Sequence, residues 1–270
     1  LAATGDTVAR ADGKFVIQVR RSSDQALKSF TADEVTDGTL LAFVGTGGSD
    51  NGFVKTWYDQ SVTNQAGNVP SGNHAVQATA ASQPKIVTSG VMVTGGLDFD
   101  GGNDKLDIPN DLISSINSAS AFLVADSDTA SGTRIPLALS RNNPDFRFYV
   151  GALLSNKFYF GYQDSFSKIE LGSADTNKHL FTSIAGSSNA EGFLDGTSKG
   201  TVSSADGKSA LSSAGIGAVN ISNFWDGTIQ EVIIYNTDQT DNRTALEANI
   251  GETYSIAGIP AYANTVNGFV

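Results

Sequence analysis

The chain contains short stretches in which β-branched and aromatic residues alternate with polar ones, separated by runs of Gly, Ser, Thr, Asn and Asp. Alternation of period two is typical of strands with one buried face, and the intervening residues are those that favour turns. Long helical patterns are nearly absent. The segments that we predict to be strands are 15–20, 53–58, 84–88, 97–100, 120–126, 134–140, 146–151, 157–162, 180–185 and 191–194.

The stretch FWDGTIQEVIIYN, from Phe224 to Asn236, predicts the longest strand of the chain, and we expect that strand to be central. An Asp-Gly turn should open it, because Gly accepts the positive φ of a tight turn. Thr240 or Asp241 is then expected to cap a short amphipathic helix. In that helix Leu246 and Ile250 lie four residues apart, so one face should pack on the sheet.

The spacing of the predicted strands, about 10 to 15 residues with turn signals between them, favours an antiparallel two-sheet sandwich over alternating strands and helices. We therefore predict an all-β jelly-roll sandwich with a short C-terminal helix. A chain of 270 residues, 40% of them hydrophobic, is long enough for one large core. We expect a single domain over residues 1–258 and an exposed tail over 259–270.

The composition excludes several classes of function. Asp and Glu number 28 against 17 Lys and Arg, a net charge of −11, so the phosphate backbone of a nucleic acid would be repelled. Arg20 and Arg21 form the one basic pair, and we expect them to neutralise nearby Asp side chains. The absence of Cys excludes disulfides and thiolate metal sites. No apolar run approaches the roughly 18 residues of a membrane helix, so no membrane span is expected.

Two groups of motifs carry a family resemblance. LDFDGGNDKLDIP (Leu97–Pro109) and WDGTIQEVIIYN with the helix after it resemble the concanavalin-A-like, laminin-G-like superfamily of β-sandwiches. IQVRRSSD (Ile17–Asp24), TWYDQS (Thr56–Ser61) and GNHAVQ (Gly72–Gln77) resemble the catalytic sandwich of fungal B-type α-L-arabinofuranosidases, with Val62 to Ser71 as an insertion. The same block is similar to modules of phage tail and other virion proteins.

The arabinofuranosidases that this chain resembles hydrolyse glycosides by means of two enzyme carboxylates about 5 Å apart. Their nucleophile position matches Gln163 in the stretch GYQD, where Asp164 stands one residue away, and their acid/base position matches Val219 in GIGAVN. Neither an amide nor an aliphatic side chain transfers the required proton. The resemblance thus implies a module that is not an enzyme. The alternative is a glycoside hydrolase whose carboxylate pair has moved.

A sugar site is predicted around the TWYDQS block, because an aromatic face stacks on sugar C–H groups while carboxylates and amides bond hydroxyls. A structural role stays open as well, with Trp57 between the sheets, Asp59 and Gln60 bonded to the following loop, and His74 in a turn or on the surface. The residues of the predicted site are Trp57, Tyr58, Asp59, Gln60, Asn73, His74, Gln163 and Asp164.

Four oxygen-bearing side chains stand close together at Asp98, Asp100, Asn103 and Asp104. Hard cations are bound by such oxygens, so calcium is a candidate ligand here, and no other cofactor is expected. The alternative is a plain hairpin, since Asp and Asn beside Gly are common in tight turns.

Together these features predict a virion-surface or extracellular module, such as a phage tail or capsid appendage, that binds a host-surface glycan or partner subunits. A second possibility is a capsid decoration or assembly protein without a ligand. In that role its sandwich faces and the tail at 259–270 would contact partner proteins or form a homo-oligomer.

Overall fold

The computed structural model describes residues 14–61, 72–110, 112, 118–140, 147–163, 167–186, 188–203, 213–218 and 222–261. Within these ranges the chain is built mainly of β-strands, and each strand pairing is antiparallel. A helix follows the last strand. The predicted all-β class, antiparallel pairing and C-terminal helix are therefore confirmed.

The first half of the chain holds the elements β1 (Phe15–Arg21), β2 (Leu27–Thr31), α1 (Ala32–Thr36), α2 (Thr39–Val44), β3 (Gly52–Trp57), β4 (Ala75–Val76), η1 (Ala80–Ser82), β5 (Lys85–Thr88), β6 (Val91–Met92), β7 (Leu97–Asp100), β8 (Leu106–Ile108) and β9 (Ser120–Ala125). The second half holds β10 (Thr133–Arg134), β11 (Leu137–Ser140), β12 (Arg147–Leu154), β13 (Lys157–Gln163), β14 (Lys168–Ser173), β15 (His179–Ala185), β16 (Asn189–Leu194), β17 (Thr197–Ser203), β18 (Ser213–Ile216), β19 (Asp226–Tyr235) and α3 (Arg243–Tyr254).

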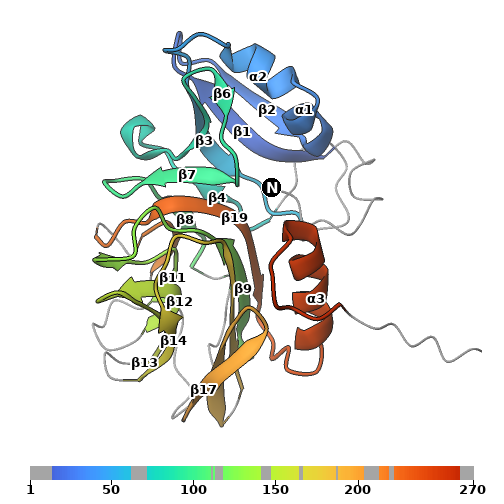
Figure 1. Cartoon of the computed structure of the whole chain (residues 1–270). Helices are drawn as coiled ribbons and strands as arrows, with labels where there is room; N and C mark the ends of the chain where they lie inside the picture. Colours follow the sequence, from blue (N-terminus) through green and yellow to red (C-terminus); the bar gives the residue numbers. More distant parts are fainter. Residues whose placement is uncertain are drawn as a thin grey trace, which may run out of the picture.

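Hydrogen-bonded pairing joins these strands into one ladder that branches at β3. Along one edge β3 pairs with β1, while β4 and β5 share its other edge. From β5 the ladder continues through β7, β19, β9, β15 and β16 to β17, and from β4 through β8, β18, β11, β12 and β13 to β14. The two ends, β14 and β17, contact one another, so the sheet curls back on itself (Figure 1). A two-sheet jelly-roll arrangement stays a prediction.

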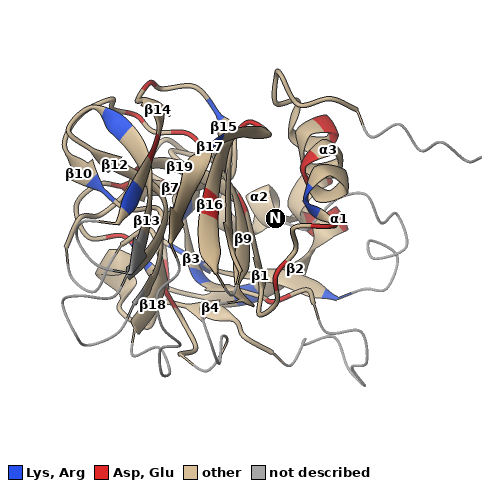
Figure 2. Ribbon diagram, turned by 90° about the horizontal axis from the view of Figure 1, so that it is seen from below, with Lys and Arg blue, Asp and Glu red and all other residues tan. Residues whose placement is uncertain are grey.

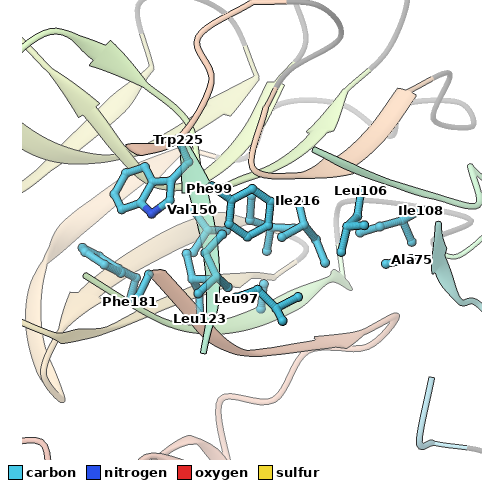
Figure 3. Packing of buried hydrophobic residues seen from close by; sticks show 14 of the residues in the cluster. Ala75, Leu97, Phe99, Leu106, Ile108, Leu123, Val150, Phe181, Ile216 and Trp225 are labelled. Atoms are coloured by element: carbon cyan, nitrogen blue, oxygen red, sulfur yellow. The ribbon is translucent and has the colours of Figure 1, made fainter. Parts of the chain in front are cut away.

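The main core fills the space enclosed by this curled ladder. Figure 3 shows Trp225 and Phe99 packed beside Leu123, Val150 and Phe181, which come from strands far apart in the sequence. Trp225 is fully buried, and its indole N–H donates to the backbone oxygen of Asp126 at 3.1 Å. The polar end of the largest core side chain is thereby satisfied.

The two Asp-Gly motifs of the resemblance lie side by side on β7 and β19. Asp226 pairs in register with Asp100, and the N–H of Gly101 donates to the backbone oxygen of Trp225 at 2.8 Å. Gly101 has φ +69° in the turn after β7, as a turn requires. The predicted turn at Asp226-Gly227 is wrong, because both residues belong to β19. Gly227 is needed there for close approach, since a Cβ would lie 2.3 Å from the backbone oxygen of Asp126.

The predicted strands are present, with one division. Segment 134–140 is split into β10 and β11, because Pro136 has no N–H and Ile135 donates to the backbone oxygen of Asn223 instead. The strands that alternation missed are β2, β8, β14, β17 and β18, together with the two-residue strands β4 and β6. All residues of β17 are exposed or partly exposed, so that strand has no apolar face to reveal it.

β19 is the longest described strand and is paired on both edges, as predicted. The α3 helix stands beside β19 and β9 (Figure 1), and Ile250 with Leu246 packs on a second core cluster over β9 and β15. The predicted cap is wrong: α3 begins after Asn242, which makes no side-chain capping bond, while Thr240 donates to Asp238 in the preceding turn.

Ile259, expected at the start of the tail, packs against that second cluster, and residues 262–270 lie outside the described ranges. Among the described residues, no helix is both long enough and apolar enough to cross a membrane.

Candidate functional site

A cleft of about 400 Å³ runs along β19 where that strand extends beyond its neighbour β7. β7 pairs only with residues 226–229 of β19, whereas β9 pairs with it as far as Tyr235. The opposite wall comes from the ends of β3, β4, β8 and β18. The described residues that line the cleft are Trp57, Tyr58, Asp59, Gln60, Ser61, Asn73, Ala75, Ile108, Leu112, Ile216, Glu231, Val232, Ile233, Ile234 and Tyr235.

Trp57 combines the two roles that the sequence left open. It is the last residue of β3, is half-buried, and packs with one part against the main core. It also lines the cleft, where Ile108 and Ile216 extend the apolar wall. The indole is therefore held by packing while it contributes to an accessible surface, which suits a stacking platform.

Tyr58 is buried beside it. Its hydroxyl lies 2.9 Å from Oγ of Ser29 on β2, and its ring meets the imidazole of His74 edge to face at 5.1 Å. These contacts fix the aromatic end of β3 from two directions.

Asp59 organises the loop at the cleft mouth. Its carboxylate accepts the backbone N–H of Ser61 at 2.9 Å and that of Asn73 at 3.0 Å, and its own N–H donates to Nδ1 of His74 at 3.1 Å. Burial by itself would raise the pKa of Asp59, but these hydrogen bonds and attraction by His74 outweigh it, so the pKa lies below its usual value. The carboxylate is thus kept ionised.

Gln60 is held in place by two bonds from its amide nitrogen, to the backbone oxygens of Phe15 and Tyr58, both at 3.0 Å. Of the predicted site, Trp57, Tyr58, Asp59, Gln60 and Asn73 therefore meet in one cleft. His74 is partly buried and acts on that group by bonding the Asp59 backbone rather than as an isolated surface residue.

Glu231 is the cleft residue that sequence reasoning missed. It is only 5% exposed, and burial raises its pKa in spite of a hydrogen bond with Tyr254. The burial of Tyr235 itself, together with the charge of Glu231, raises the pKa of Tyr235. A bulge between Ile229 and Glu231 breaks the alternation of β19, so simple period-two reasoning assigned no special face to this carboxyl group.

The solved structures of carbohydrate-active proteins include domains similar to this chain. An arabinofuranosidase complexed with arabinofuranosyl-alpha-1,2-xylobiose aligns with 87% of this chain and 58% of its own, at 14% identity and a TM-score of 0.52. A mutant GH54 α-L-arabinofuranosidase soaked with 4-nitrophenyl α-L-arabinofuranoside has the same identity and coverage and a TM-score of 0.54. Domain 4 of a GH43 extracellular arabinanase from Geobacillus stearothermophilus aligns with 67% of this chain and 83% of its own, at 13% identity and a TM-score of 0.44.

The likeness shows a shared fold. The chain spans less than two thirds of the length of the two arabinofuranosidases, and no protein-family model or curated protein matches it. The likeness agrees at the level of fold with the resemblance of the TWYDQS block to arabinofuranosidases.

Two of the predicted site residues cannot be placed in the cleft. Gln163 ends β13, where its backbone pairs with Arg147, and its side chain lies outside the described part of the structure. Asp164 and Val219 also lie outside the described residues. Their predicted roles stay predictions.

The acidic turn after β7 has a clear structural role. The Asp100 carboxylate accepts the backbone N–H groups of Gly102 at 2.8 Å and Asn103 at 3.1 Å. Asp104 is only 4% exposed, and its Oδ2 accepts the N–H of Asp100 at 3.2 Å. Burial raises the pKa of Asp104 to about 7, and the charge of Asp100 adds to the effect.

The predicted calcium ligands Asp98, Asp100, Asn103 and Asp104 do not all face one point. Asp98 and Asp100 share a face of β7, whereas Asp104 turns inward to the Asp100 backbone. Within the described ranges, no group of three or more His, Cys, Asp or Glu side chains is placed to hold a metal ion. Calcium at this turn stays a prediction.

Charge around the cleft is one-sided. Asp59 and Glu231 line it, and no Lys or Arg is among its described lining residues. In Figure 2 the positions of Lys and Arg, and those of Asp and Glu, are distributed over many strands and helices of the described chain.

Proposed function

We propose that this protein is a glycan-binding module with a concanavalin-A-like, laminin-G-like two-sheet jelly-roll fold. The observation that supports this function is the meeting of an anchored aromatic, Trp57, with Asp59, Gln60 and Asn73 in one cleft. Flat apolar faces beside fixed hydrogen-bonding groups match the alternating C–H and O–H surface of a sugar. The module works outside the cell or on a virion surface, as part of a phage tail or capsid appendage.

The ligand of the cleft is a neutral glycan. A carboxylate or sulfate on the sugar would be repelled by Asp59, and no described cation in the cleft offsets that charge. Neutral hydroxyls donate to the Asp59 carboxylate and accept from amide N–H groups without this penalty.

A glycan array with purified protein, followed by calorimetry on the best neutral ligand, tests this function. The variant W57A should lose about tenfold or more in affinity, since a central aromatic contact is worth on the order of 2 kcal/mol. N73A should also weaken binding, while N177A, an exposed Asn on the loop before β15, is the matched control. Absence of binding to any neutral glycan at millimolar concentration would leave a purely structural virion role.

The module is non-catalytic in this proposal, because Gln163 and Val219 stand at the positions where the resembling enzymes carry their carboxyl groups. One observation favours a second candidate, a glycoside hydrolase. Asp59 and Glu231 line the same cleft with pKa shifts in opposite directions, as an ionised base and a protonated acid require.

Release of 4-nitrophenol from a panel of aryl glycosides, including an α-L-arabinofuranoside, separates the two candidates. Hydrolysis by the wild-type protein that E231Q abolishes supports the hydrolase. Binding without hydrolysis supports the non-catalytic module. A cryo-microscopy map of a particle carrying this chain tests the virion assignment independently.

A further inference from the structure

A second pocket, of about 350 Å³, lies over a row of cross-strand neighbours on β1, β3, β5 and β7. Arg20 pairs with Phe53, Phe53 pairs with Lys85, and Lys85 pairs with Asp98. Directly paired side chains lie on the same face of a sheet, about 5 Å apart. The pocket therefore has a floor set by strand register. Its described lining residues are Arg20, Ser22, Gln25, Phe53, Ala80, Ala81, Gln83, Lys85, Asp100 and Asp104.

The guanidinium of Arg20 is held rigidly at one end of this row. Its Nε donates to Oε1 of Gln83 at 2.8 Å, Nη1 donates to Oε1 of Gln25 at 2.6 Å, and Nη2 donates to the backbone oxygen of Ala80 at 2.9 Å. The group also lies 4.4 Å from the ring centre of Phe53. Gln83 is only 3% exposed, so the main support of the guanidinium is buried.

Among the described residues, no carboxylate forms an ion pair with Arg20 or Lys85 at this end. All three partners of Arg20 are uncharged, contrary to the sequence prediction that both arginines neutralise Asp side chains; only Arg21 does so, with Asp24. Three of the five N–H donors of Arg20 bond described residues, and the other two bond none of them. Lys85 forms no ion pair or hydrogen bond with a described residue, and its charge acts on Asp98, Asp100 and Asp104 at longer range.

The other end of the pocket accepts hydrogen bonds. Oδ2 of Asp104 accepts the backbone N–H of Asp100, whereas its Oδ1 accepts no hydrogen bond from a described residue, and Asp104 lines the pocket. A ligand that fits the whole pocket therefore brings an anionic group to Arg20 and Lys85 and a hydroxyl donor to Asp104.

We propose that this pocket binds a sugar acid, with its carboxylate between Arg20 and Lys85 and a hydroxyl donating to Asp104. A neutral sugar leaves both cations unpaired, and a dianion such as phosphate is repelled by Asp100 and Asp104. A volume of about 350 Å³ is near the lower limit of ligand pockets, so one sugar unit fits rather than a chain. The site shares no described lining residue with the cleft at Trp57.

Isothermal titration calorimetry with D-galacturonate and the matched neutral sugar D-galactose tests the assignment, with a chelator present to remove bridging cations. We expect saturable binding of galacturonate but not of galactose. K85Q should bind about tenfold or more weakly, because a charge-assisted hydrogen bond is lost. The matched control is K199Q, which removes an exposed Lys on β17 and should bind as the wild type does. Equal affinity in K85Q and K199Q overturns the assignment.

Amide chemical shifts of the wild-type protein give a readout that needs no variant. Galacturonate should perturb Arg20, Gln83 and Asp104 and leave Gln60 and Asn73 unchanged. Perturbation confined to Gln60 and Asn73 would place the ligand in the cleft, and no perturbation at saturating sugar would remove the site. Either result contradicts the proposal. Perturbation of Gln60 and Asn73 would also contradict the exclusion of acidic sugars from the cleft, whereas the absence of any perturbation has no bearing on neutral glycan binding.

Discussion

Nδ1 of His179 lies 2.7 Å from Oδ2 of Asp195, joining the start of β15 to the turn after β16. Nε2 of the same ring lies 3.0 Å from Oδ1 of Asp175, and Asp195 also accepts the backbone N–H of Leu180. Burial by itself lowers the pKa of His179, but the two carboxylates outweigh it and the net pKa is raised. The imidazole ring of His179 therefore links three segments of the chain.

This link makes stability depend on pH. Because the folded-state pKa of His179 is above the unfolded value, its contribution is fully present below about pH 6.5 and is lost as pH rises through the folded pKa. At pH 5.5 the substitution H179Q removes hydrogen bonds of a charged ring and should lower the free energy of unfolding by about 1.5–3 kcal/mol. At pH 8.5 the loss should be smaller. Urea unfolding at both values measures this. An equal loss at both would exclude a contribution from protonation.

Asp104 is a buried carboxyl group whose ionisation destabilises the folded protein. Its pKa is raised from 3.8 to about 7, so the folded state retains a proton that the unfolded state releases between these values. Stability should fall as pH rises from about 4 to above 7, by at most about 4 kcal/mol for three pKa units. D104N should be more stable than wild type at pH 8 by on the order of 1–3 kcal/mol, with D241N, an exposed site, unchanged. A destabilised D104N at pH 8 would refute this.

Substitution of Gly227 and of Gly200 by Ala distinguishes the effect of a steric clash from that of backbone strain. Both have positive φ, +139° and +121°, but a Cβ on Gly227 would lie 2.3 Å from the backbone oxygen of Asp126, whereas nothing lies within 4 Å at Gly200. G200A should cost about 1–3 kcal/mol from strain alone. G227A should cost more, or prevent folding, because the clash is with backbone. Thermal and urea unfolding of G200A and G227A measure the two losses of stability. Similar losses would mean that the backbone of β19 shifts to accommodate the added Cβ.

The Arg243–Glu247 pair should matter more than the exposed Lys157–Glu170 pair. Glu247 is only 2% exposed, burial raises its pKa, and Arg243 both bonds it and stacks 4.2 Å from the ring centre of Phe193. R243A leaves a buried carboxylate unpaired and should cost about 3–5 kcal/mol. K157A should change the free energy of unfolding little, because solvent screens an exposed ion pair. Adding E247Q to R243A should recover part of the loss; no recovery would assign the effect to lost stacking.

The sequence alone determined the local features of this protein. Alternation of apolar and polar residues identified most strands, including β19, because the choice between buried and exposed faces is made within a few residues. Trp57, Tyr58, Asp59 and Gln60 were found together for the same reason: they are consecutive at the end of one strand, so their neighbourhood required no knowledge of the fold.

Tertiary structure decided which distant residues meet. Glu231 reaches the cleft because a bulge turns it and because β7 ends where β19 continues. Arg20, Phe53 and Lys85 form one row only through the register of three strands, and a shift of one residue would send each side chain to the opposite face. The alternation of side chains shows which residues prefer the buried face of a strand. The pairing and register of strands depend on hydrogen bonds between segments far apart in the chain. Those partners are fixed only when the sheet closes.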